Sequence, residues 1–117
     1  KKIIELDSSN VLALYNLGYL YAKRKQYTMS EEYLLKCVEF DSSFHRAYYN
    51  LGYIYFQRNE AKRAIKYFSE AIRVKPDFSE AYYNRAKAYK SVGDEKMHKM
   101  DMKKYKKLPK PNKNKLH

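Results

Sequence analysis

The chain has 117 residues, with 25 Lys or Arg against 13 Asp or Glu, so its formal net charge is +12. This length suits one domain, because two domains would each be too small to bury a stable core. No apolar run approaches the roughly 20 residues that span a bilayer, there is no apolar leader, and the single cysteine, Cys37, excludes an intramolecular disulfide. Aliphatic residues are scarce, but 14 tyrosines can supply apolar core surface. We therefore expect a soluble protein of the cytoplasm.

The sequence repeats itself with a period of 34 residues. Three similar segments, ALYNLGYLY, AYYNLGYIY and AYYNRAKAY, begin at residues 13, 47 and 81. Asn16, Asn50 and Asn84 consequently stand in equivalent positions. A period of this length is typical of solenoids, in which each repeat is one supersecondary unit that buries its apolar face against its neighbours.

Each period contains two predicted helices. In the second period, apolar residues recur at helical spacing from Tyr48 to Tyr55 and again from Ala64 to Val74. In chain order, we expect helices at about residues 10–24, 28–40, 44–58, 61–74, 78–92 and 95–107. Pro76 follows the fourth of these helices, where a proline ends a helix.

Polar turn residues precede the first helix of each period. The segments 7–10, 41–43 and 76–77, which read DSSN, DSS and PD, are predicted to supply N-capping side chains for these helices. Gly93 and Asp94 are predicted to form a tight turn inside the third period.

The second period has a fitting residue at all eight signature positions of a known repeat, with Tyr48 where tryptophan is usual. Its signature residues are Tyr48, Leu51, Gly52, Tyr55, Ala64, Phe68, Ala71 and Pro76. This pattern resembles the tetratricopeptide repeat, and the resemblance implies an all-α fold, a right-handed superhelical solenoid of antiparallel helix pairs. The third period is degenerate, because Arg85, His98, Met102 and Tyr105 replace signature residues. The small residues at Gly18, Gly52 and Ala86 are expected to let paired helices approach closely.

The resemblance divides the chain into five parts. Residues 1–10 match the end of a truncated preceding repeat, 11–44 and 45–78 are the first and second repeats, 79–108 are a degenerate C-terminal repeat or capping helix, and 109–117 are a basic tail. Terminal repeats are expected to be atypical, because their outer face meets water. Ile3, Ile4 and Leu6 would form an uncovered apolar edge, so self-association through exposed repeat ends is also possible.

The first helices of such an array line its concave face. The candidate peptide-binding residues on this face are Tyr15, Asn16, Tyr19, Arg46, Tyr49, Asn50, Tyr53, Tyr83, Asn84, Lys87 and Lys90. A carboxamide can both donate to and accept from one peptide unit. The three asparagines resemble the asparagine ladder of O-linked N-acetylglucosamine transferase repeats, which implies that they hold the main chain of a partner peptide. They are also consistent with a residue that is simply common at this position of the family.

Two further readings of this face concern charge. Arg46, Lys87 and Lys90 would favour an acidic segment in a partner. The carboxylate clamp of chaperone cofactors, another binding mode of the family, requires lysine, arginine and asparagine at five positions. This chain has Tyr15, Tyr19, Asn50, Glu80 and Asn84 at those positions, so only the middle asparagine matches.

The excess positive charge lies near the C-terminus. Residues 96–117 contain nine lysines and one aspartate, which is +8 of the total +12. Lysines of this segment could bind nucleic acid or an anionic membrane surface through phosphate groups. The lysines of this alternative are Lys103, Lys104, Lys106 and Lys107. Only Tyr105 is interleaved among them, whereas dedicated single-strand binders present several stacking rings.

The sequence offers no pattern for catalysis. His45, His98 and His117 lie on separate predicted elements, and Cys37 occupies a position where the family has a small buried residue. We find no metal-ligand spacing and no phosphate-binding glycine loop, so we expect no enzyme activity, no metal and no cofactor. A protein-interaction module that binds a partner peptide is the favoured function.

Overall fold

The computed structural model describes residues 8–111, which form six helices and no strand. The helices are α1 (Ser8–Lys23), α2 (Tyr27–Phe40), α3 (His45–Gln57), α4 (Ala61–Val74), α5 (Ser79–Ser91) and α6 (Glu95–Lys107). Each observed boundary lies within two residues of its predicted position.

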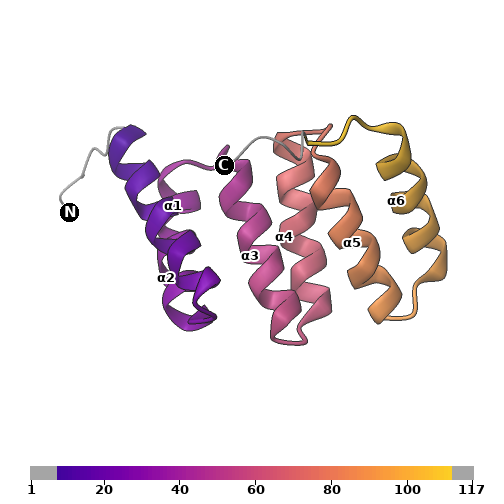
Figure 1. Cartoon of the computed structure of the whole chain (residues 1–117), viewed down its shortest axis with the longest axis horizontal. Coiled ribbons are helices and arrows are strands. Elements are labelled where there is room, and N and C mark those ends of the chain that lie inside the picture. Colours follow the sequence, from indigo (N-terminus) through magenta and orange to yellow (C-terminus); the bar gives the residue numbers. More distant parts are fainter. Residues whose placement is uncertain (1–7, 112–117) are drawn as a thin grey trace.

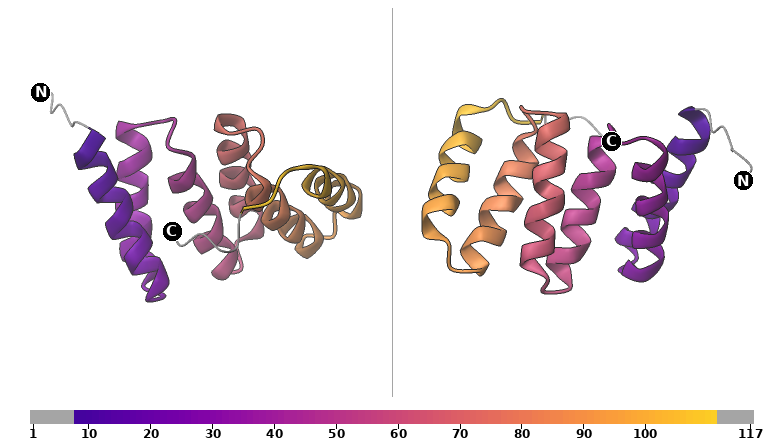
Figure 2. Two further views of the ribbon diagram at one scale, coloured as in Figure 1. Left: turned by 45° about the horizontal axis from the view of Figure 1, so that its top comes forward. Right: turned by 180° about the vertical axis from the view of Figure 1, so that it is seen from behind.

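The helices form three antiparallel pairs that stand side by side in chain order (Figure 1). The pairs α1–α2, α3–α4 and α5–α6 are joined by contacts of α2 with α3 and of α4 with α5. Figure 2 shows the same row from two other directions, with α1 and α6 at opposite ends. The predicted all-α solenoid of antiparallel helix pairs is therefore confirmed.

Close helix approach inside the first two pairs depends on glycine. A Cβ atom added to Gly18 would lie 2.6 Å from Cγ of Leu34, and one added to Gly52 would lie 2.6 Å from Cδ1 of Phe68. Both opposing side chains are fully buried. The expectation that these glycines permit close packing of the paired helices is confirmed.

One residue in each intra-pair turn adopts a left-handed backbone conformation. The φ angle is +59° at Lys25, +65° at Asn59 and +82° at Gly93, and these three residues are equivalent in the 34-residue period. Glycine adopts this conformation freely and asparagine tolerates it, whereas other side chains cost roughly 1–2 kcal/mol. The predicted turn at Gly93 is confirmed, and Lys25 is strained relative to its two counterparts.

The capping prediction was wrong for the first helices of the second and third pairs. Phe44 and Phe78 occupy the N-cap positions of α3 and α5, and neither helix has a side-chain cap. Asp41 instead accepts hydrogen bonds from the backbone N and the Oγ of Ser43, at 3.0 and 2.7 Å, and so stabilises the loop before α3. A side-chain cap exists at α6, where Asp94 accepts from the backbone N of Met97 at 3.1 Å. Phe44 and Phe78 instead contribute apolar contacts at these positions, Phe44 with Tyr15 and Phe78 with Tyr49.

The degenerate third repeat contains a buried ion pair that the sequence analysis did not predict. The Nε and Nη2 atoms of Arg85 donate to the two carboxylate oxygens of Asp101, both at 2.8 Å. Nη1 donates to Oγ of Ser69 on α4 at 3.0 Å. The carboxylate is buried, so this bidentate pair joins α4, α5 and α6 at a site where the second repeat has Leu51.

His98 also has a structural role that sequence comparison did not reveal. Its Nδ1 lies 2.9 Å from the carbonyl oxygen of Ala86, and because that oxygen can only accept, Nδ1 carries the proton. In the first repeat, Oγ of Ser30 donates to the carbonyl oxygen of Gly18 at 2.7 Å. Histidine therefore makes the same helix-to-helix bond as the small residue at this position.

Glu31 joins the first repeat to the second. Its carboxylate accepts from the hydroxyl of Tyr55 at 2.5 Å and from Nη1 of Arg58 at 2.8 Å. Burial alone would raise the pKa of Glu31, but the hydrogen bonds from Tyr55 and Arg58 and the charge of Arg58 outweigh it and lower this pKa below its ordinary value of 4.5.

This lowered pKa predicts an acid-dependent contribution to stability. Because the folded state holds Glu31 ionised, its contribution is complete above the unfolded pKa and is lost as the pH falls through the folded pKa. We expect wild type to be more stable than Glu31→Gln at pH 6, and the difference to shrink as the pH is lowered below about 4. Urea unfolding of both proteins from pH 6 to pH 3 measures the difference in their free energies of unfolding. A difference that does not change with pH would contradict the prediction.

The N-terminal end of the array is an open apolar surface. Leu17 and Leu20 of α1 are 40% and 50% exposed, whereas the equivalent residues of α3, Leu51 and Ile54, are both 0% exposed. The reason is that α3 packs between α2 and α4, while no helix precedes α1 among the described residues. The edge that the sequence assigned to Ile3, Ile4 and Leu6 lies outside the described residues.

Candidate functional site

The candidate binding residues lie on α1, α3 and α5, the first helices of the three pairs. α1 contacts α3 and α3 contacts α5, so these helices form one continuous face. The 34-residue period places equivalent side chains of the three helices in rows along this face.

Two of the three asparagines form hydrogen bonds from one repeat to the next. Nδ2 of Asn50 donates to the hydroxyl of Tyr15 at 3.0 Å, and Nδ2 of Asn84 donates to the hydroxyl of Tyr49 at 2.8 Å. Nδ2 of Asn84 also donates to the carbonyl oxygen of Glu80 at 3.0 Å. The residues stand in register along the face, and part of their hydrogen-bonding capacity stabilises the stacking of repeats.

The groups left for a ligand differ among the three asparagines. Asn50 keeps Oδ1 and one N–H, although the residue is only 8% exposed. Both N–H groups of Asn84 already have acceptors, so a two-bond contact with a peptide there would have to displace one of them. Asn16 lies on α1 and is exposed.

The tyrosines that accept these bonds are partly buried and remain neutral. Burial raises the pKa of Tyr15 and raises that of Tyr49 to about 12. Each ring also packs on a phenylalanine, with centroids 5.0 Å apart for Tyr15 and Phe44 and 5.1 Å apart for Tyr49 and Phe78. These two tyrosines are therefore held rigidly by packing and by hydrogen bonds.

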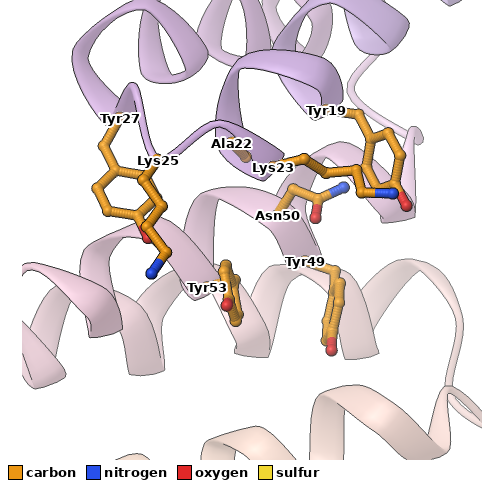
Figure 3. A pocket seen from close by; sticks show the side chains of 8 residues that line it. All are labelled: Tyr19, Ala22, Lys23, Lys25, Tyr27, Tyr49, Asn50 and Tyr53. Atoms are coloured by element: carbon orange, nitrogen blue, oxygen red, sulfur yellow. The ribbon is translucent and has the colours of Figure 1, made fainter.

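A pocket of about 340 Å³ opens between α1 and α3 (Figure 3). Its lining residues are Tyr19, Ala22, Lys23, Lys25, Tyr27, Tyr49, Asn50 and Tyr53. Four of them, Tyr19, Tyr49, Asn50 and Tyr53, belong to the predicted binding set. The pocket thus combines aromatic walls, one carboxamide and two ammonium groups.

Sequence reasoning missed Lys25 and Tyr27 as pocket residues. Both lie at the turn into α2 rather than on the face of a first helix. A helical-wheel argument cannot place them in the pocket. The sequence does show one signal: lysine stands at position 25, whereas the equivalent turn positions hold Asn59 and Gly93.

The other candidates lie away from this pocket. Arg46 lines a second hollow, of about 260 Å³, together with Phe78, Glu80 and the segment 109–111. Tyr83 packs on Tyr105 of α6 at 5.0 Å. Lys87 has its Nζ 5.5 Å from the centre of the Tyr83 ring.

Lys90 is exposed on α5. Four of the eleven candidates therefore line the pocket between α1 and α3, whereas two on α1, one on α3 and four on α5 lie outside it: Tyr15, Asn16, Arg46, Tyr83, Asn84, Lys87 and Lys90.

The start of the basic tail folds back onto the array. Nζ of Lys110 donates to the carbonyl oxygens of Tyr105 and Leu108 at the end of α6 and lies 4.3 Å from the centre of the Tyr105 ring. Residues 112–117 lie outside the described residues. Lys103, Lys104, Lys106 and Lys107 belong to α6 and are exposed.

The side chains of Cys37 and His45, which could be chemically reactive, are buried or partly buried in the fold. Cys37 is fully buried, its Sγ donates to the carbonyl oxygen of Val11 at 3.8 Å, and burial raises the pKa of its thiol to about 12. Burial, followed by the charges of Arg46 and Lys75, lowers the pKa of His45. Among residues 8–111, no three His, Cys, Asp or Glu residues are grouped to hold a metal ion, and no helix has the length and apolar character to cross a membrane. His117 lies outside the described residues.

Comparison with solved structures places this chain among helical repeat proteins. MamA is 26% identical, with a TM-score of 0.79 over 81% of this chain and 56% of the MamA chain, so this chain spans little more than half the length of MamA. The first TPR of Spaghetti (RPAP3), bound to the HSP90 peptide SRMEEVD, is 22% identical, with a TM-score of 0.85 over 95% of this chain and 88% of that one. The N-terminal domain of stress-induced protein-1 from C. elegans is 16% identical, with a TM-score of 0.78 over 86% of each chain.

Family models give the same result at the sequence level. No curated protein matches the sequence. A model described as TPR repeat matches residues 52–93, and one described as tetratricopeptide repeat matches residues 11–44 and 79–112, which together exceed half of the chain. The protein belongs to the tetratricopeptide repeat family.

Proposed function

We propose that the protein is a protein-interaction module that binds a partner peptide on the face formed by α1, α3 and α5. The observation that carries this proposal is the pocket between α1 and α3, where Tyr19, Tyr53 and Asn50 converge. Tyrosine offers a large contact area at low entropic cost and is typical of recognition surfaces. The proposal is also supported by two structural neighbours, the first and second TPRs of Spaghetti (RPAP3), which were solved with an HSP90 peptide.

In this proposal the pocket takes a side chain of the peptide and Asn50 holds its main chain. The remaining N–H and Oδ1 of Asn50 can satisfy one peptide unit, and Asn16 extends the row toward the N-terminal end. Tyr83, Asn84, Lys87 and Lys90 would contact the peptide further along the face. A volume of about 340 Å³ suits one or two side chains, so the rest of the peptide lies across the open face.

The experiment that tests this function selects binders from a random dodecapeptide library with the purified protein. Tyr19 and Tyr53 are each 38% exposed, so the double variant Tyr19→Ala/Tyr53→Ala should fold normally. We expect selected peptides to lose about tenfold or more in affinity for this variant, because recognition tyrosines contribute most of the binding energy. The matched control is Phe40→Ala on α2, which removes an aromatic side chain of similar exposure outside the pocket.

Two outcomes would redirect the proposal. If selected peptides bind the double variant as tightly as wild type, the pocket is not the site. If binding is lost only when Lys103, Lys104, Lys106 and Lys107 are changed to glutamine, the lysine-rich C-terminal helix is the site, as the anionic-partner alternative predicts. A carboxylate clamp would instead require a free C-terminal carboxylate, which an amidated copy of each selected peptide tests.

A further inference from the structure

The turn between α1 and α2 contains a lysine where the other two turns contain asparagine and glycine. Lys25, Asn59 and Gly93 all have positive φ angles and occupy equivalent positions. Lysine is the least suited of the three to this conformation, because its Cβ crowds the backbone and it lacks the short polar side chain by which asparagine can hydrogen-bond locally. Strained residues that folding does not require are often found at functional sites.

The side chain of Lys25 is exposed and lines the pocket. Figure 3 shows Lys25 and Tyr27 on one side of the pocket, Lys23 and Tyr19 on the other, and Asn50 between them. Two ammonium groups therefore flank one set of tyrosine rings.

Neither ammonium group has an acidic partner among residues 8–111. Nζ of Lys23 lies 5.5 Å from the centre of the Tyr19 ring, and Lys25 makes no ion pair with a described carboxylate. Some other cations of the described residues are paired, for example Arg58 with Glu31 at 2.8 Å and Lys75 with Asp77 at 3.0 Å, whereas others, such as Lys87 and Lys90, are not. The mouth of the pocket thus carries two positive charges that are free to meet a ligand.

We infer that Lys25, together with Lys23, determines the specificity of the pocket for a peptide in which an acidic residue adjoins an apolar one. This inference rests on the proposed peptide-binding function and names the partner chemistry. The apolar side chain packs among Tyr19, Tyr49 and Tyr53, and the neighbouring carboxylate accepts hydrogen bonds from one of the two ammonium groups, which lie on opposite sides of the pocket.

A peptide fits this site better than a nucleic acid strand. Single-stranded nucleic acid is bound along a continuous positively charged groove, with one phosphate after another neutralised. Here the two lysines flank a single pocket, and the next helix of the face, α5, carries Glu80 as well as Lys87 and Lys90, so the positive charge is not continuous. An acidic side chain needs only one of these charges.

The test uses two fluorescein-labelled nonapeptides, one with a central phenylalanine between glutamates and one with glutamines in place of the glutamates. We expect wild type to bind the glutamate peptide about fivefold more tightly at low salt, and Lys25→Gln to remove most of this preference. Lys25→Arg should retain it. The matched control is Arg24→Gln, which removes the same charge one residue away at a position that does not line the pocket.

A second variant separates binding from folding. Lys25→Gly introduces the residue found at the equivalent turn of the third repeat, so it should raise the melting temperature by a few degrees. The same variant should bind the glutamate peptide more weakly than wild type does. A merely structural role for Lys25 would move both properties in the same direction or leave binding unchanged.

Each remaining outcome overturns the inference. Equal affinity of wild type for the two peptides, no binding of either peptide, or a preference that survives Lys25→Gln would do so. Binding of labelled oligo-dT that is lost in Lys25→Gln, without a preference for the glutamate peptide, would assign the pocket to nucleic acid. The library selection with Tyr19→Ala/Tyr53→Ala decides the proposed function separately, so the two failures are distinguishable.

Discussion

Replacement of Arg85 with leucine should lower the free energy of unfolding by about 3–5 kcal/mol, because it leaves the buried carboxylate of Asp101 without its partner. A loss of this size is a large part of the stability of a small domain. Since each repeat contacts only its neighbours, the effect should be concentrated at the C-terminal end of the array. We expect α6 to lose protection from amide hydrogen exchange before the other helices do.

The second repeat supplies the control for this variant. There, Leu51 stands in place of Arg85, and Tyr67 stands in place of Asp101 and packs on the ring of Tyr55 at 5.3 Å. The double variant Arg85→Leu/Asp101→Tyr therefore restores a packing arrangement that this chain already uses. An apolar replacement of a buried ion pair is often neutral or stabilising, so the double variant should recover most of the loss. A double variant as unstable as Arg85→Leu alone would contradict this account.

Substitution of Gly52 with alanine should destabilise the protein, although alanine is the better helix former. The added Cβ would lie 2.6 Å from the ring of Phe68, which is fully buried and cannot retreat. Overpacking of this kind costs about 1–3 kcal/mol, whereas helix propensity returns at most about 1 kcal/mol. Chemical denaturation of the purified variant measures the net loss.

The third repeat again provides a matched control. It has Ala86 and Met102 at the positions of Gly52 and Phe68. Methionine is flexible and fills irregular space, so Gly52→Ala/Phe68→Met should be more stable than Gly52→Ala alone. If Gly52→Ala is as stable as wild type, the close approach of α3 and α4 does not depend on glycine.

The fold could be predicted from the sequence because every repeat presents the same apolar spacing. The period of 34 residues fixed all six helices to within two residues, and the glycines indicated which helix faces meet. The N-caps of α3 and α5 could not be predicted in the same way, since polar residues in a turn serve loop geometry as readily as a helix end. The roles of Arg85 and Asp101 were missed because the signature describes what a repeat usually buries, not what can replace it.

The candidate site was predictable in part. Helical periodicity placed Tyr19, Asn50 and Tyr53 on one face, and these residues line the same pocket. Which donors and acceptors remain open could not be inferred, because the bond from Asn50 to Tyr15 joins residues that are 35 positions apart. The position of Lys25 at the pocket depends on the geometry of the turn between α1 and α2, which a helical-wheel argument does not include.

The two ends of the array differ in a way that determines how the protein could be extended by design. Leu17 and Leu20 present α1 as an apolar surface shaped for one more helix. The exposed residues of α6, by contrast, are mostly lysines, whose mutual repulsion and hydration disfavour a stacked neighbour. An idealised repeat fused ahead of residue 8 should therefore continue the solenoid, whereas the same repeat fused behind α6 should fold, if at all, as a separate unit.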